Sequence, residues 1–598
     1  MVPHQVSYES PVLFAIFLTY FKDTDFVKLE ECALKAGATN EEWKNFIAYA
    51  GGFYANMSNY HNFGHMKFVP ELASFERFEL ILRSHPEANK DGSLMHHVLE
   101  VLPLIDKEVM AYQKPYTQIN FPDEGGVTGY FSRNMGKDDL KAVQDVLKAE
   151  KVDILNTRAF KQENGDIVIT VGSIEEHSRQ VTHQGRNFIF QYGEFRPFLE
   201  ETNYYLEKAL PYCANDTQKR MLELYIEHYK TGSIETHKDS QRQWIRDKGP
   251  VVETNMGWIE TYLDPSNTRA YYEGWVSVVD KERSKKFNAL VANSEAIIPL
   301  LPWPKEMEKD KFLAPDFTTL DIIGFATTGC PLGINIPNYD DIRESEGFKN
   351  VFLLNSLGSY QVSNVEFATP EQGKILAENT LRCYEIHVAC HELLGHGTGK
   401  LIYRDKDGSA YKFTDPYTGE QHESCYEEGE TWNGRFGAIS TSFEECRADT
   451  AGFFLAQLPE VYTLFGFNES EIDQMLWVNI MNQLRKGILG LPLFNAETNK
   501  WGQAHTQGAY VLSMYIYRNQ KSDIVKFELN AEKDEFFIHL NQENLVKEGK
   551  ELIRKFLIIL QTYKSAGAID IASKWYAKYS EVDDFFLEVR KLVLKKKK

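Results

Sequence analysis

Apolar residues recur at helical spacing through much of the first part of the chain, and two short stretches alternate instead. Residues 26–36, 40–50 and 138–151 place apolar side chains three and four positions apart, which predicts amphipathic helices. Residues 166–172 (DIVITVG) alternate and are rich in β-branched side chains, which predicts a strand, and residues 188–192 are a second candidate. We therefore expect a mostly helical region that also holds a small sheet.

The pattern changes twice in the middle of the chain. Residues 251–279 form a second β-rich stretch, which Asp264-Pro265 interrupts. Residues 281–301 return to helical spacing, residues 324–341 are rich in Gly, Pro and Asn and predict a loop, and from residue 371 onwards long helices dominate. Helical and β-rich stretches are thus segregated, which indicates an α+β protein.

Length and charge limit the function. A chain of 598 residues predicts two to four structural units or two large lobes. The formal net charge of -20 argues against a nucleic-acid binder, which needs a basic face. It suits solubility, and it also suits cationic partners such as peptides with a free amino terminus.

The chain shows no sign of export or membrane insertion. Residues 1–17 have no basic leader and no clear cleavage site, so we expect no signal peptide, and no apolar stretch reaches the ~18 residues of a transmembrane helix. The seven cysteines are odd in number, scattered, and without a C-x-x-C motif, which favours a reducing compartment. A cytoplasmic protein is the expectation.

The strongest chemical signal is the hexapeptide His391-Glu392-Leu393-Leu394-Gly395-His396. The usual zinc-peptidase motif, H-E-x-x-H, sets two histidines at i and i+4 on one helical face. Here the spacing is i and i+5, which at about 100° per residue separates the two side chains by roughly 140° on an ideal helix. A π-bulge would bring His396 back into line, and Gly395 is the plausible place for it.

The remaining parts of a zinc site can be assigned from the same reasoning. Glu392 follows the first histidine and is the expected general base. Zinc needs a third protein ligand, and we assign Glu445, in a predicted helix over residues 442–458 with Ser442 as its N-cap. Asp449, at i+4 from Glu445, and Glu444 would then hold the histidines as acceptors.

Each of these motifs has an ordinary interpretation when taken alone. Two histidines occur on surface helices, and Glu444-Glu445 resembles a solvated helical face. Together they favour a metal site. His387 and His391 are also four apart, but Val388 stands where the base should be, so we expect His387 to lie in the core or behind the site.

The pairing of HELLGH with EECRAD, residues 444–449, resembles the dipeptidyl peptidase III family of zinc exopeptidases, and the combination is highly specific. Further matching stretches extend the similarity over nearly the whole chain. These are residues 56–70 (NMSNYHNFGHMKFVP), 333–341 (GINIPNYDD), 429–432 (GETW) and 502–505 (GQAH).

The resemblance implies two lobes around a wide cleft. One lobe would be mixed, with a small β-barrel, over residues 1–273 and 319–362. The other would be mainly helical and hold one Zn²⁺, over residues 274–318 and 363–598. It further implies a cytosolic enzyme that releases dipeptides from the free amino ends of short oligopeptides, with the lobes closing on the peptide.

The resemblance also implies roles for single residues. Glu445 would be the third zinc ligand, Glu392 the base, and His505 a group that stabilises the transition state. Glu253, Asn335 and Asn338 match residues that hold the substrate's amino terminus, which suits their chemistry because carboxylate and amide oxygens accept from an ammonium.

The chain departs from the family pattern in several places. Asn255 stands where animal members carry tyrosine, Asn433 replaces an aspartate, and Ala509 replaces an arginine, so side-chain preference is expected to differ. Both ends are short against the family pattern, which is expected to affect the β-barrel lobe. Some members bind a Kelch-repeat adaptor through Glu-Thr-Gly-Glu; residues 417–420 read YTGE here, which disfavours that partner.

Two other functions stay open from the sequence. One is a non-catalytic relative that binds peptides without turnover, which the ligand set and base disfavour and the short ends favour. The other is a different zinc hydrolase, such as an endopeptidase, which the residues for the amino terminus disfavour. Cobalt or manganese could replace zinc with these ligand types.

Overall fold

The computed structural model describes residues 1–598 except 24, 63, 354, 356–364 and 597–598. The chain divides into two compact units. Unit 1 holds Met1–Ser240, Asn255–Trp275 and Phe325–Cys330, and unit 2 holds Gln241–Thr254, Val276–Gly324 and Pro331–Lys598. Helices and mixed sheets occur together, so the α+β prediction is confirmed.

Unit 1 begins with helices around an aromatic core. Phe17, Phe46 and Phe78 are fully buried there and contact one another edge-on or tilted. The predicted helices over 26–36, 40–50 and 138–151 are present as α3 (Phe26–Lys35), α4 (Asn40–Asn56) and α8 (Lys137–Ala149). The other α-helices of this part of the chain are α1 (Val2–Val6), α2 (Ser10–Phe21), α5 (Phe75–Arg83), α6 (Leu94–Glu100), α7 (Asp106–Met110), α9 (Arg196–Ala209), α10 (Asp216–Thr231) and α11 (Ile234–Arg246).

A four-stranded sheet completes unit 1, and its strand order is β1-β2-β4-β3. The predicted strands 166–172 and 188–192 are β2 (Ile167–Gly172) and β4 (Arg186–Glu194), which pair in parallel. Alternation explains β2, because Ile167, Ile169 and Val171 are buried on one face. The remaining strands are β1 (Thr157–Lys161) and β3 (Ser178–His183).

A five-stranded sheet has the order β5-β6-β7-β9-β8. The chain passes between the units along β5 (Val252–Glu260), β6 (Tyr271–Val279) and β7 (Asp316–Phe325). β8 (Gly333–Ile336) ends the order and pairs antiparallel with β9 (Lys349–Leu353). The prediction of a loop over 324–341 was therefore wrong in part, because β8 and the start of α14 (Asp340–Ser345) lie within it.

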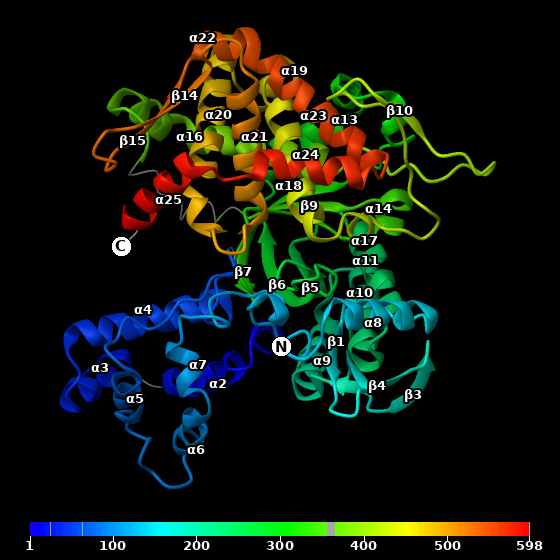
Figure 1. Cartoon of the computed structure of the whole chain (residues 1–598). Coiled ribbons are helices and arrows are strands. Elements are labelled where there is room, and N and C mark those ends of the chain that lie inside the picture. Colours follow the sequence, from blue (N-terminus) through cyan, green and yellow to red (C-terminus); the bar gives the residue numbers. More distant parts are fainter. Residues whose placement is uncertain (24, 63, 354, 356–364, 597–598) are drawn as a thin grey trace. The chain divides into compact units, whose positions relative to one another are not determined.

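Unit 2 is mainly helical, and its central helices run side by side in the upper part of Figure 1. α18 (Ser440–Leu455) is buried on nearly all sides and packs against α16 (Pro370–Cys390), α21 (Ala504–Asn519) and α23 (Lys550–Ser565). α16 in turn packs against α20 (Ile472–Leu489). Polar residues buried all round a helix need hydrogen-bond or ion-pair partners within the protein. Those of α18 find partners in the cluster described in the next section.

The predicted start of α18 was wrong. The helix begins at Ser440, two residues before Ser442, and the Ser442 hydroxyl lies 2.6 Å from the Tyr576 hydroxyl instead of capping a backbone N–H. The Ser442 hydroxyl, which the local sequence predicted to cap the helix, thus makes a tertiary hydrogen bond instead.

The shorter elements of unit 2 border these central helices. The remaining α-helices are α12 (Ser284–Ala292), α13 (Ser294–Ile297), α17 (Trp432–Phe436), α19 (Pro459–Tyr462), α22 (Gln542–Asn544), α24 (Ile569–Ser580) and α25 (Asp584–Lys596). The remaining strands are β10 (Lys412–Thr414), β11 (Gln421–Glu423), β12 (Phe494–Asn495), β13 (Lys500–Trp501), β14 (Val525–Leu529) and β15 (Phe536–Leu540). The YTGE segment lies in the turn between β10 and β11.

Two expectations about the whole chain can be compared with these elements. Among the helices that the structure describes, none has both the length and the apolar character to cross a membrane. All seven cysteines are free thiols in the structure.

Candidate metal centre and active site

The HELLGH motif begins where α16 ends. His391–Gly395 form a π-helical turn, in which the His396 N–H donates to the His391 carbonyl at 2.9 Å. This confirms the predicted π-bulge. Gly395 is required because a Cβ there would lie 2.9 Å from the Ala448 Cα and carbonyl oxygen, so α18 could not pass this close to any larger residue.

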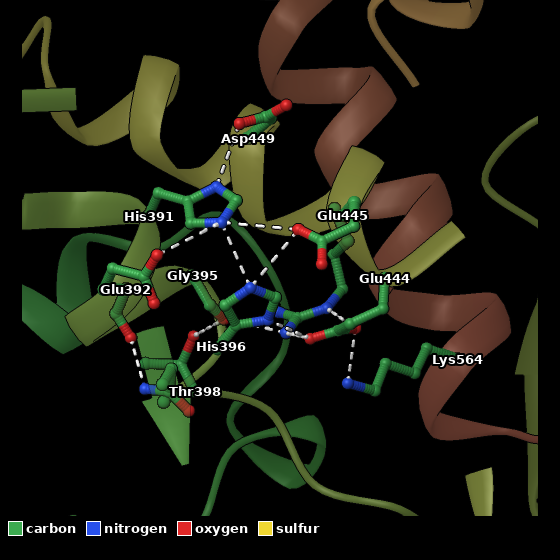
Figure 2. A network of polar contacts seen from close by, with 12 residues as sticks. His391, Glu392, Gly395, His396, Thr398, Glu444, Glu445, Asp449 and Lys564 are labelled. Atoms are coloured by element: carbon green, nitrogen blue, oxygen red, sulfur yellow. Dashed lines mark hydrogen bonds and ion pairs between the residues drawn. The ribbon is translucent and has the colours of Figure 1, made fainter. Parts of the chain in front are cut away.

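Three donor atoms converge beside this turn (Figure 2). His391 Nε2 lies 3.1 Å from His396 Nε2, and Glu445 Oε2 lies 3.4 Å and 3.5 Å from these two nitrogens. Zinc held tetrahedrally at about 2.0–2.1 Å requires donors about 3.3–3.4 Å apart. The triangle therefore has the size of one face of a zinc tetrahedron, and these residues fit the metal.

The other ring nitrogen of each histidine lies against a carboxylate. His391 Nδ1 is 2.9 Å from Asp449 Oδ1, and His396 Nδ1 is 3.0 Å from Glu444 Oε1. A carboxylate at Nδ1 holds the proton there and leaves the Nε2 lone pair for a metal. Asp449 and Glu444 thus lie where the sequence placed them.

Charges in this cluster shift the pKa values strongly. Burial lowers the pKa of His391, but Asp449 and Glu445 outweigh it and raise that pKa well above its usual range. Burial raises the pKa of Glu445, but His505 and His396 hold it well below its usual range. Protons therefore compete with a metal for the histidines as pH falls.

Two cations that the sequence analysis missed hold Glu444. The Arg447 guanidinium donates to both Glu444 oxygens, through Nε at 2.9 Å and Nη2 at 2.6 Å, and Lys564 Nζ lies 2.6 Å from Oε2. Arg447 is fully buried, and its Nη2 also donates to the Gly395 carbonyl. Arg447 is part of the EECRAD motif and could have been predicted from it, whereas no sequence motif indicated a role for Lys564.

Asp449 is held differently. His387 Nε2 lies 3.1 Å from its Oδ1, and Lys486 Nζ lies 3.3 Å from its Oδ2. This agrees with the expectation that His387 lies behind the site. His387, His391 and Asp449 could themselves surround a metal, but the Lys486 ammonium at Asp449 disfavours a second cation there.

Glu392 points toward the converging nitrogens, with Oε1 3.9 Å from His391 Nε2. Burial raises its pKa, against the opposing charges of His391 and His396. Strand β8 passes directly over the carboxylate, because a Cβ at Gly333 would lie 2.5 Å from Glu392 Oε1. A buried carboxyl with a raised pKa is suited to accept a proton near neutral pH.

His505 reaches the same cluster from the start of α21. Its Nδ1 lies 3.5 Å from Glu445 Oε2 and 3.8 Å from Asp449 Oδ2, and the side chain is one-third exposed. The structure therefore brings together seven of the residues chosen from sequence: His391, Glu392, His396, Glu444, Glu445, Asp449 and His505.

Asn335 is joined to this cluster through the backbone. Its Nδ2 donates to the Glu392 carbonyl at 2.7 Å and to Asn350 Oδ1, while its Oδ1 is buried without a hydrogen-bond partner in the described part of the chain. A fixed amide with an unused acceptor next to the base suits an ammonium donor.

The other two residues expected to hold an amino terminus lie elsewhere. Glu253 is buried, and its carboxylate accepts from Trp244 Nε1 at 2.6 Å and from Lys349 Nζ at 2.9 Å. Lys349 and Asn350 are neighbours on β9, so their side chains leave opposite faces, and Glu253 lies on the face opposite the Asn335–Asn350 pair. Asn338 is exposed, beyond the end of β8.

Arg343 fixes the segment that follows β8, another contact the sequence did not predict. Its guanidinium donates to the carbonyls of Pro337 at 3.1 Å and His396 at 3.2 Å. The segment after β8 is thereby tied to the metal-binding turn.

Comparison with known proteins gives one consistent result. A model of peptidase family M49 matches residues 101–598. Dipeptidyl peptidase 3 of Nematostella vectensis is 37% identical over 624 residues, and that of Homo sapiens is 37% identical over 631; each match covers 99% of this chain and 84% of the relative.

Solved structures agree on the fold. Dipeptidyl-peptidase III from Corallococcus sp. strain EGB matches with a TM-score of 0.61 at 17% identity, over 98% of this chain and 89% of that one. DPP III from Caldithrix abyssi matches with a TM-score of 0.55 at 17% identity, over 96% of each chain.

Proposed function

The chain belongs to peptidase family M49 and is a metallopeptidase of the dipeptidyl peptidase III type, and from that premise we propose that it is a zinc-dependent exopeptidase. It would release dipeptides from the free amino terminus of short oligopeptides. One observation carries the proposal: His391 Nε2, His396 Nε2 and Glu445 Oε2 form a triangle of tetrahedral-zinc size beside the Glu392 carboxylate.

A bound zinc would supply Lewis-acid polarisation and lower the pKa of a water molecule. Glu392 would accept the proton of the attacking water on its carboxylate and later deliver it to the leaving amine. Its burial supports this role, because a raised pKa brings the carboxyl closer to the working pH of a proton shuttle.

His505 would support the negative charge that develops on the carbonyl oxygen. A partly exposed imidazole beside Glu445 can donate one N–H into the site while the carboxylate holds the ring.

The amino terminus of the peptide would be held at β8. This strand is at the end of its sheet, and an exposed strand edge can pair with an extended peptide. Asn335 Oδ1 would accept from the terminal ammonium, and Asn338 would assist. Glu253 would act only indirectly, because its carboxylate is already paired with the Lys349 ammonium.

The test is release of a dipeptide from a dipeptidyl-naphthylamide, with and without a chelator. We expect turnover that the chelator abolishes and zinc restores, a loss of at least about 10³-fold in kcat for Glu392→Gln, and none for an N-acetylated substrate. Turnover of the acetylated substrate would indicate an endopeptidase. Folded, zinc-loaded protein without turnover would indicate a peptide-binding relative.

A further inference from the structure

A small cavity lies between α16, α18 and α20, behind the candidate metal site. It has a volume of about 20 Å³, and its lining includes His387, Phe453, Asn479, Gln483 and Lys486. Lys486 also contacts Asp449, so the cavity is two side chains away from His391.

Hydrogen-bond donors are concentrated on one wall. Asn479, Gln483 and Lys486 occupy positions i, i+4 and i+7 of α20, which places them on one helical face. Asn479 and Gln483 are 5% and 4% exposed, and Asn479 Nδ2 and Gln483 Nε2 have no hydrogen-bond partner among the described residues. Buried N–H groups left without an acceptor are costly, so an acceptor is expected in the cavity.

Among the described residues, no polar group accepts a hydrogen bond from these two amide nitrogens. Asn482 is engaged by Thr380 and Arg485. His387 directs Nε2 to Asp449. Its Nδ1 has no hydrogen-bond partner among the described residues and lies against Gly452, where a Cβ would be 2.9 Å away. Asp449 already faces His387, His391 and Lys486. Two amide donors therefore remain for the occupant. The Lys486 ammonium, which contacts Asp449 through one of its donors, lines the same cavity, so the set of donors favours negative charge.

The size of the cavity restricts the occupant. About 20 Å³ exceeds the ~10–15 Å³ that one water molecule requires, so the cavity can hold one small occupant. The Lys486 side chain is 30% exposed, so the site has access to solvent. We propose that this cavity binds one halide-sized monovalent anion, held by Asn479 Nδ2, Gln483 Nε2 and the Lys486 ammonium.

Bromide is the probe, because its anomalous X-ray scattering distinguishes it from water. Crystals of the full chain soaked in sodium bromide should show an anomalous peak within hydrogen-bond distance of the Gln483 and Asn479 amides. Halide NMR line broadening in solution would give the affinity.

Gln483→Met and Asn479→Leu each remove one donor while keeping the Lys486–Asp449 contact. Each should weaken bromide binding roughly tenfold. Lys550→Met is the matched control. It removes a partly exposed lysine of α23 that pairs with Asp473 of α20, and it should leave bromide binding unchanged.

Ordered water in the cavity without an anomalous peak would overturn the proposal, as would bromide bound only elsewhere on the protein. Bromide binding that both variants leave intact would also overturn it. Should a variant fail to fold, the wild-type bromide peak alone still decides between anion and water.

Discussion

The two histidines whose Nε2 atoms converge are held from behind by carboxylates in unlike surroundings. Glu444, behind His396, accepts from the buried Arg447 guanidinium at two points and from Lys564. Asp449, behind His391, instead faces a second histidine and the partly exposed Lys486. Both carboxylates have pKa values well below the usual range, because cations outweigh the effect of burial.

Both carboxylates hold a histidine ring in place, but breaking their contacts should cost different amounts of free energy. At Glu444 a fixed bidentate pair is removed from solvent, so breaking it leaves a buried charge uncompensated. At Asp449 one partner is neutral and another is partly solvated, so the loss of one contact is better tolerated. We therefore expect that loss of the Glu444 carboxylate lowers both stability and metal affinity, whereas loss of the Asp449 carboxylate lowers mainly metal affinity.

The largest effect is expected from Arg447→Met. Removing the buried guanidinium leaves Glu444 short of a cation, and it also takes donors from Gln561 and the Gly395 carbonyl. The free energy of unfolding of the metal-free protein, measured in urea, should fall by roughly 3–5 kcal/mol. Arg435→Met, which breaks a part-exposed pair with Glu430, is the control and should cost about 1 kcal/mol or less.

Glu444→Gln and Asp449→Asn compare the two carboxylates directly. Each should weaken zinc binding about 10- to 100-fold in a chelator competition, because the acceptor at Nδ1 of each histidine loses its negative charge. Only Glu444→Gln should also lower stability substantially, since it leaves Arg447 and Lys564 without their anion. Equal losses of stability in the two variants would contradict the distinction.

Lys564 should make the free energy of unfolding depend on pH. Burial and the nearby Arg447 charge lower its pKa from 10.5 to about 8. Between about pH 8 and 10.5 the unfolded chain then holds more protons at this lysine than the folded chain, so its contribution to the free energy of unfolding rises with pH.

Lys564→Met should remove that rise, which urea unfolding of the metal-free protein at several pH values would reveal. Lys550→Met, on the same α23, should keep the wild-type slope. If the free energy of unfolding changed with pH in the same way in wild type and Lys564→Met, the rise would not be due to Lys564.

The smallest effect is expected from Lys486→Met. Its ion pair with Asp449 is partly exposed, and His387 and His391 remain against the carboxylate. Stability should fall by about 1 kcal/mol or less, and zinc affinity by less than tenfold. A hundredfold loss of zinc affinity would contradict this and would show that Lys486 matters as much for zinc binding as the Asp449 carboxylate does.

The metal-binding turn could be predicted because its constraint is local. His396 lies five positions after His391, and a regular α-helix cannot direct both at one ion, so the π-helical turn follows from spacing alone. The choice of Glu445, with Glu444 and Asp449 behind the histidines, also rested on helical spacing, and the structure brings these side chains together.

Other features were outside the reach of local reasoning. Ser442 has the side chain of an N-cap, yet it contacts Tyr576, 134 residues away. Residues 324–341 have the composition of a loop, yet part of that segment pairs with β9 to become β8. Pairing partners distant in sequence decided both cases, and propensity yields to such contacts.

The sequence by itself determined the α+β class, because periodicity acts over one or two helical turns. The resemblance of two motifs to a known family gave the peptidase family, and those motifs also contain the residues whose donor atoms form the triangle at the π-helical turn. Only the tertiary structure decided which cations stabilise the carboxylates. It pairs Glu444 with Lys564 and Glu253 with Lys349, across 120 and 96 residues. A lysine's spacing says nothing about its partner, because burial and charge balance are set only when distant helices and strands pack.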